Sequence, residues 1–246
     1  MEVKNNPAGR LSDILHLALT YPQDKTLKVV WAGIFNINPD QTGLVLQMFA
    51  ETISLVTETK KSIERIDDVD HELFLEPFKQ IDLLFSRINM DAPWKNYLQY
   101  LDDKTLYGLR HASDKLSRVS GYKIIPENEI ESIYSEIDQL LVEVIRSDFP
   151  EELKALFQKN LESLMHALLV YRIHGIDGLT NELDRAIGSL IRNNQKKYSG
   201  YDKSPHQDHF KKLWEILINI NTLVTMAQGV YDLTGPAMEA IGGFLR

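Results

Sequence analysis

Apolar residues recur along this chain at steps of three and four, the spacing of one face of an α-helix. The clearest run shares one helical face and comprises Ile130, Ile133, Tyr134, Ile137, Leu140, Leu141, Val144 and Ile145. A second run follows at Leu153, Leu156, Phe157, Leu161, Leu164, Met165 and Leu168. A helix with one apolar stripe buries it against other helices, so the pattern predicts an all-α fold.

The spacing predicts eight to ten helices, arranged as an N-terminal helical group and a C-terminal antiparallel helical bundle. The segment Ser120–Pro126 is the best candidate boundary, which gives an N-terminal region of 1–120 and a bundle of 121–246. An ordinary loop inside one continuous domain is the alternative. In the predicted helix over 72–88, Pro77 either starts the helix or kinks it.

Several residue types mark helix ends. Asn6 is the expected N-cap of the first helix, with Pro7 in its first turn, and Asp102 is expected to cap the helix that ends near Val119. Asp148 and Glu151 have the spacing of a capping box. Further along, Gly175 is expected to follow a helix end as a C′ glycine.

Composition narrows the function classes. The chain has 246 residues and a formal net charge of −8, and both of its halves are mildly acidic, which disfavours a broad nucleic-acid surface. It has no cysteine, which excludes disulfides, thiolate zinc sites and cysteine nucleophiles. The first residues lack the apolar core of a signal peptide, and no apolar run has the roughly 18 residues of a membrane span. We therefore expect a cytoplasmic protein and consider membrane association a minor alternative.

The last apolar segment, from Leu213 onward, covers more than one helical face. Such a helix is buried in a core, docked on a partner or inserted in a membrane. For the second case, the expected interface residues are Trp214, Leu217, Leu223, Met238 and Phe244.

Arginine followed by histidine after four to six residues resembles the active-site motif of the HEPN-type ribonucleases, in which the imidazole assists attack by the 2′-hydroxyl. Two segments match, Arg10…His16 and Arg65…His71. The second is the stronger candidate, because three aspartates between its members offer a partner that would orient the ring. The resemblance names Arg65 and His71 as catalytic in this alternative; the hydrophobic Ile66 departs from the motif.

Two further clusters have weaker chemistry. A basic, aromatic-containing stretch would contact nucleic acid through Arg192, Lys196, Lys197 and Tyr198, although cations also complement a helix C-terminus. His206 and His209 share a helical face, but no partner cluster accompanies them, so we expect no metal site. No glycine-rich phosphate loop is present, and we expect no cofactor.

The stretch Leu161–Arg192, especially Tyr171–Leu179 and Ala186–Leu190, resembles a segment of uncharacterised bacterial all-helical proteins. The resemblance covers about an eighth of the chain. It implies a bacterial or phage-related origin and a place among mobile-element or defence genes, with no activity and no catalytic residue attached.

These observations favour a non-enzymatic interaction or assembly protein, an accessory component of a bacterial defence or mobile-element system, with a protein partner or a homo-oligomeric state. Two alternatives stay open. One is a HEPN-like ribonuclease, and the other is a membrane-active effector that uses the C-terminal apolar helix.

Overall fold

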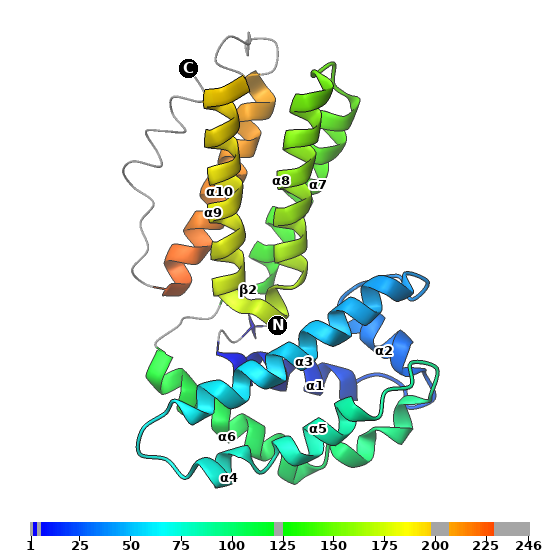
Figure 1. The fold of residues 1–246 in the computed structure, drawn as a ribbon. Coiled ribbons are helices and arrows are strands. Elements are labelled where there is room, and N and C mark those ends of the chain that lie inside the picture. Colours follow the sequence, from blue (N-terminus) through cyan, green and yellow to red (C-terminus); the bar gives the residue numbers. More distant parts are fainter. Residues whose placement is uncertain (1, 4–5, 121–124, 198–206, 229–246) are drawn as a thin grey trace. The chain divides into compact units, whose positions relative to one another are not determined.

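The computed structural model describes residues 2–3, 6–120, 125–197 and 207–228 (Figure 1). The described residues form ten α-helices, and the predicted all-α class is confirmed. The chain divides into two compact units. The N-terminal unit comprises 3–124 together with Arg172–Gly175, and the C-terminal unit comprises 1–2, 125–171 and 176–246.

The N-terminal unit is built around its first helix, α1 (Pro7–Leu19), which is buried on most of its surface. The other elements of this unit are α2 (Leu27–Ile34), α3 (Thr42–Glu64), α4 (His71–Leu75), α5 (Phe78–Ser86), the 3₁₀ turns η1 (Trp94–Asn96) and η2 (Leu98–Tyr100), and α6 (Asp103–Ser120). Helix α1 packs against α2, α3 and α6. Its position explains why even Arg10 and Ser12 are buried.

An aromatic cluster fills the part of this unit's core that lies between α2, α3, α5 and η1. The ring of Trp31 lies 4.8 Å from that of Phe49 and 6.1 Å from that of Trp94, measured between centroids. Phe85 of α5 packs edge-on against Trp31 at 6.0 Å. These large side chains hold α2, α3, α5 and η1 together through buried apolar area.

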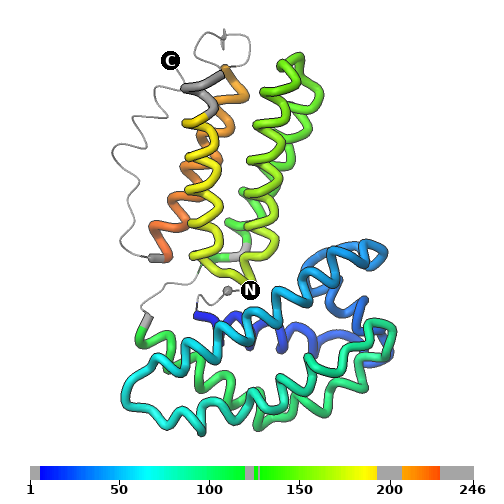
Figure 2. The backbone as a smooth tube through the Cα atoms, viewed as in Figure 1, coloured from blue at the N-terminus to red at the C-terminus, as the bar shows by residue number. Residues whose placement is uncertain are grey.

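The C-terminal unit is an antiparallel helical bundle, as predicted, with the chain path traced in Figure 2. Its helices are α7 (Glu127–Arg146), α8 (Glu151–Leu169), the later part of α9 (Tyr171–Lys197) and α10 (Gln207–Gln228). Lys212 pairs with Glu143, and Asn219 donates to Glu136. Residue numbers therefore increase along α10 as they decrease along α7, so the two helices are antiparallel. The two-residue strands β1 (Glu2–Val3) and β2 (Ile125–Pro126) pair with each other.

Most predicted helix ends are confirmed. The Asn6 side chain accepts from the backbone N–H of Gly9 at 2.8 Å, and that of Asp102 accepts from Thr105 at 2.8 Å. Pro77 separates the expected helix over 72–88 into α4 and α5. The predicted capping box at Asp148 is wrong, because Pro150 is the N-cap of α8 and its fixed φ starts the helix there.

Gly175 interrupts α9 with φ 60° and ψ −155°, a conformation that is essentially restricted to glycine. The four residues that end there, Arg172–Gly175, belong to the N-terminal unit and are called the strap below. Each of the first three strap residues is anchored to this unit. Arg172 donates to the carbonyl of Ile34, the carbonyl of Ile173 accepts from Arg10, and His174 pairs with Glu51 at 3.1 Å.

Candidate binding groove

A hollow of about 420 Å³ lies in the N-terminal unit, where α4, the start of α5 and α6 meet. On its apolar side lie Leu73, Phe74, Pro77, Tyr107, Gly108 and His111. We call this hollow the groove. The phenyl ring of Phe74 and the imidazole of His111 are stacked, with centroids 5.4 Å apart and planes 6° from parallel. The stack joins α4 to α6 along the groove.

Gly108 allows α6 to approach Pro77 closely. A Cβ atom at position 108 would lie 2.3 Å from Cγ of Pro77, far inside the van der Waals distance. The proline in turn separates α4 from α5, so the shape of the groove depends on this glycine and this proline together.

Two large side chains of the groove are turned toward solvent. Leu73 is 65% exposed and Tyr107 is 73% exposed. Single exposed apolar residues are ordinary on protein surfaces, but these two adjoin one apolar hollow. Their apolar area is available for burial by a ligand or a partner.

Charged side chains complete the lining. Lys79 donates to one carboxylate oxygen of Glu76, and Nζ of Lys104 lies 3.9 Å from the other. The hydrogen bond and the positive charge of Lys79 lower the pKa of Glu76, and the same pair raises the pKa of Lys79. Hydrogen bonds from the side chain and backbone of Thr105 lower the pKa of Asp102.

These shifts bear on the chemistry that the groove supports. A carboxylic acid that donates a proton near neutral pH needs a raised pKa, usually through burial. Glu76 and Asp102 have lowered pKa values, so both stay ionised and act as fixed charges. Among the described residues, no group of three or more His, Asp or Glu side chains is placed to hold a metal ion. Neither Glu76 nor Asp102 therefore has the raised pKa of a general acid.

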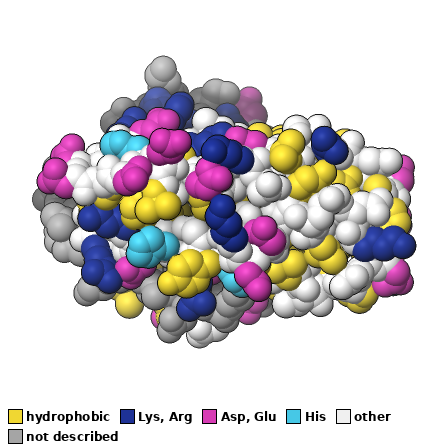
Figure 3. All heavy atoms as spheres, turned by 90° about the horizontal axis from the view of Figure 1, so that it is seen from below, with side chains coloured by type: hydrophobic (Ala, Val, Ile, Leu, Met, Phe, Trp, Pro, Cys, Tyr) yellow, Lys and Arg dark blue, Asp and Glu magenta, His cyan; other side chains and the backbone are white. Residues whose placement is uncertain are grey.

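The face that Figure 3 presents includes side chains of both charge signs, interspersed with apolar ones. A nucleic-acid surface gathers lysine and arginine on one face or along one helix. The mixture in this view lacks that segregation.

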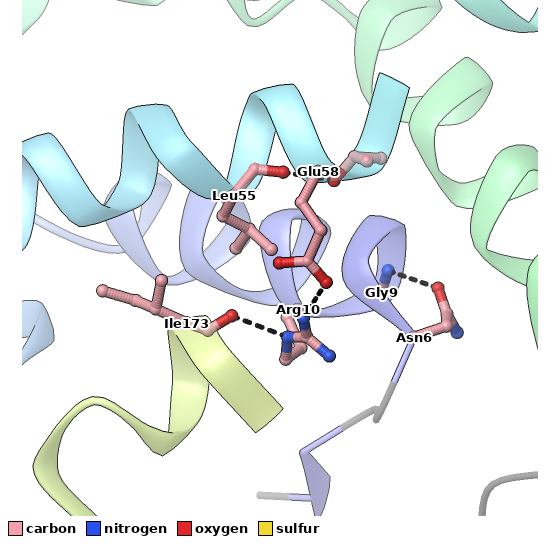
Figure 4. Close-up of polar contacts among 7 residues, drawn as sticks. Asn6, Gly9, Arg10, Leu55, Glu58 and Ile173 are labelled. Carbon is pink, nitrogen blue, oxygen red and sulfur yellow. Dashed lines mark hydrogen bonds and ion pairs between the residues drawn. The ribbon is translucent and has the colours of Figure 1, made fainter. Parts of the chain in front are cut away.

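Of the first candidate ribonuclease pair, Arg10 lies in the interior of the N-terminal unit, beside Glu58 and Ile173 (Figure 4). The Arg10 side chain is 3% exposed, and it donates to the carbonyl of Ile173 and to Glu58, each at 2.8 Å. His16 is half-buried, and its Nδ1 lies 2.7 Å from the carbonyl of Ser12 in the same helix. Arg10 therefore has a structural role and offers no surface to RNA.

Arg65 and His71 are both exposed, at the end of α3 and the start of α4. Nε2 of His71 donates to the carbonyl of Ile66 at 2.9 Å, so a backbone group orients the ring where a carboxylate was expected. The side chain of Asp70 instead caps α4 by accepting from Leu73. The ribonuclease alternative stays a prediction.

The predicted C-terminal interface is only partly within the described residues. Leu217 and Leu223 are buried among the bundle helices, whereas Trp214 is half-buried. Met238 and Phe244 lie outside the described residues, so the part of the interface that they would form stays a prediction. In this structure, Leu217 and Leu223 contribute to the core of the bundle.

The weaker candidates are placed as follows. Arg192 is exposed on α9, and this helix includes Lys196 and Lys197, of whose side chains nothing is described. Tyr198 and His206 lie outside the described residues. His209 packs against Phe149, with ring centroids 5.2 Å apart.

Sequence reasoning missed the groove. Leu73, Phe74, Tyr107 and His111 have no predicted role in the sequence analysis. The available signal was the position of Leu73 and Tyr107 off the apolar stripes of their helices. That signal is weak, because only the packing of α4 against α6 brings the two side chains to one hollow.

Comparison with protein families, curated proteins and solved structures finds no match for this chain. In the described part of the chain, none of the helices combines the length and the apolar character that crossing a bilayer requires.

Proposed function

We propose that this chain is a helical interaction protein that binds a segment of another protein in the groove between α4 and α6. The observation that carries the proposal is an apolar hollow flanked by two exposed large side chains, Leu73 and Tyr107. Tyrosine is among the residues that contribute most to binding energy at protein interfaces.

The hollow is at the small end of the range for ligand sites, about 300–1,000 Å³, and small-molecule sites bury most of the ligand surface. Here Leu73 and Tyr107 extend the apolar surface outward, beyond the hollow itself. A protein segment would cover both side chains and also fill the hollow. A hollow between two helices suits a partner helix that inserts apolar residues spaced three or four apart.

Accessory roles in bacterial defence or mobile-element systems belong to the same class of interaction protein. The resemblance at Leu161–Arg192 supports such a role, and a protein-binding groove is compatible with it. Leu217 and Leu223 are buried, which favours the groove over α10 as the contact surface.

The test is a selection of binding peptides from a displayed random library on the full-length protein. Peptides that bind the groove should lose at least tenfold in affinity for a Leu73→Ala, Tyr107→Ala double variant, because two interface side chains are truncated. Both positions are exposed, so the helical circular dichroism spectrum should be unchanged.

Leu46→Ala is the matched control. Leu46 is an exposed leucine of the same unit, 46% accessible, on α3 and outside the groove lining. Its truncation should leave peptide affinity within twofold of the parent protein. Equal losses in the control and the double variant, or selected peptides that ignore both, would contradict the proposed site.

A further inference from the structure

We infer that the segment bound in the groove is acidic as well as amphipathic, and that Lys104 selects it. This inference rests on the proposed function. Its starting point is the difference between the negative and the positive groups in the lining of the groove.

The two carboxylates of the lining are already engaged. Asp102 accepts from the backbone N–H of Thr105 and so caps the first turn of α6. Glu76 accepts from Lys79 on one oxygen and faces Lys104 on the other. Both carboxylates have lowered pKa values, which shows that neighbouring donors already stabilise the charged form. Neither group requires a cationic partner.

Lys104 is engaged more weakly, through the negative charges of Glu76 and Asp102. Its side chain is 80% exposed, and its ammonium approaches Glu76 only to 3.9 Å, the outer limit of an ion pair. An ammonium has three donors, so a second carboxylate can bind without displacing Glu76. A partner carboxylate beside Lys104 would also lie next to the apolar hollow, because Lys104 is part of its lining.

Helix α6 as a whole has an excess of positive charge, although its other basic residues lie outside the groove lining. Its sequence contains Lys104, Arg110, Lys115 and Arg118 against Asp103 and Asp114, in a chain with a net charge of −8. Arg110 is exposed one turn beyond Tyr107, and Arg118 pairs with Asp114 at 2.8 Å. The net positive charge of α6 favours the approach of an acidic segment, and within the lining, which also contains Glu76 and Asp102, Lys104 is the residue of α6 through which this attraction acts.

The occupant is therefore a helix of another protein with two kinds of position. Apolar side chains at steps of three or four would enter the hollow and cover Leu73 and Tyr107. A carboxylate on the flank of the same helix would pair with Lys104. A basic amphipathic helix with the same apolar spacing would meet Lys79 and Lys104 and bind more weakly.

The experiment uses the same displayed library on the full-length protein and on Lys104→Glu. Peptides selected on the parent should be rich in Asp and Glu beside their apolar positions, and Lys104→Glu should weaken them about tenfold, because attraction becomes repulsion. Selection on Lys104→Glu should shift the enriched peptides toward Lys and Arg. The control is Lys95→Glu, an exposed lysine of the same unit outside the groove lining, which should change affinity less than twofold.

The outcomes separate the two proposals. Peptides that depend on Leu73 and Tyr107 but show no acidic enrichment, or tolerate Lys104→Glu as well as Lys95→Glu, would overturn the inference and leave the proposed function standing. If no selected peptide depends on Leu73 and Tyr107, the proposed function fails and the inference fails with it.

Discussion

Arg10 shows how burial decides the meaning of a residue. The sequence presents it as half of a motif for RNA cleavage, whereas the fold encloses it and gives its donors to Glu58 and to the carbonyl of Ile173. Gly175 lies against the same guanidinium, since a Cβ at this position would be 2.5 Å from Nη1 of Arg10. Arg10 and Gly175 therefore both contribute to the packing of the strap against α1.

Asp102 provides a prediction at the residue scale. Asp102→Ala removes the acceptor for the Thr105 N–H and should lower the free energy of unfolding by about 1 kcal/mol at pH 7. The pKa of Asp102 is lowered in the folded state, so this stabilisation is present above the unfolded value of about 3.9 and disappears as pH falls through the folded value. Denaturant unfolding at pH 7 and at low pH measures the difference.

Asp102→Asn is the control for this prediction, because asparagine caps helices about as well as aspartate and does not titrate. It should keep most of the stability at pH 7. A stability gap between Asp102→Ala and the parent that stays constant down to the lowest pH would contradict the role of the charge.

The parts of the fold that the sequence predicts are the helices with an apolar stripe and the helix ends with a local cap. Asn6 and Asp102 were identified as caps because their bonds are local, within three residues. Asp148 was misassigned because Pro150 competes as a start signal two residues later. The groove was not predictable in this way, since Leu73 and Tyr107 are neighbours of one hollow only after α4 and α6 have packed.

The contact between Gly108 and Pro77 gives a prediction at the scale of helix packing. Gly108→Ala places a methyl group 2.3 Å from Cγ of Pro77, so α6 must move away from the α4–α5 junction. We expect a loss of about 1–3 kcal/mol in the free energy of unfolding, as for other overpacked sites. Thermal or denaturant unfolding measures it, and groove-binding peptides should also weaken.

Gly43→Ala is the matched comparison, because nothing lies within 4 Å of a Cβ at this position of α3. Alanine is the better helix former, so this variant should be neutral or more stable by up to about 1 kcal/mol. If both glycine variants behave alike, close packing at Gly108 is not the cause.

For the whole molecule, the important feature is that the N-terminal unit is discontinuous in sequence. Its strap, Arg172–Gly175, comes from a later part of the chain, whereas residues 3–124 supply the rest. The expected boundary at Ser120–Pro126 therefore describes only one of the chain crossings between units. The strap escaped prediction because its anchors, Ile34, Arg10 and Glu51, are more than a hundred residues away.

This discontinuity predicts that a fragment of residues 1–124 is less stable than the same unit in the full chain. Without the strap, Arg10 loses its hydrogen bond to the Ile173 carbonyl, and a hydrogen bond to a charged group contributes about 1.5–3 kcal/mol. In a Trp214→Phe full-length protein, both remaining tryptophans, Trp31 and Trp94, belong to this unit. Denaturation followed by tryptophan fluorescence then compares the two forms directly.

Arg10→Met separates the strap from other effects of truncation. It should cost more stability in the full chain, where it breaks the bond to the strap, than in the fragment, where that bond is already absent. Equal costs in the two forms would show that Arg10 and the strap are not coupled.

The late position of the strap also sets an order of events on the ribosome. When residue 124 has been added, the N-terminal unit still lacks Arg172–Gly175, and nearly fifty more residues must be polymerised first. At bacterial or eukaryotic elongation speeds this interval lasts about 2–10 s, far longer than helices need to form. During that interval the Arg10 guanidinium lacks the Ile173 carbonyl that accepts from it in the finished fold, so the N-terminal unit reaches its full stability only after the strap has been made.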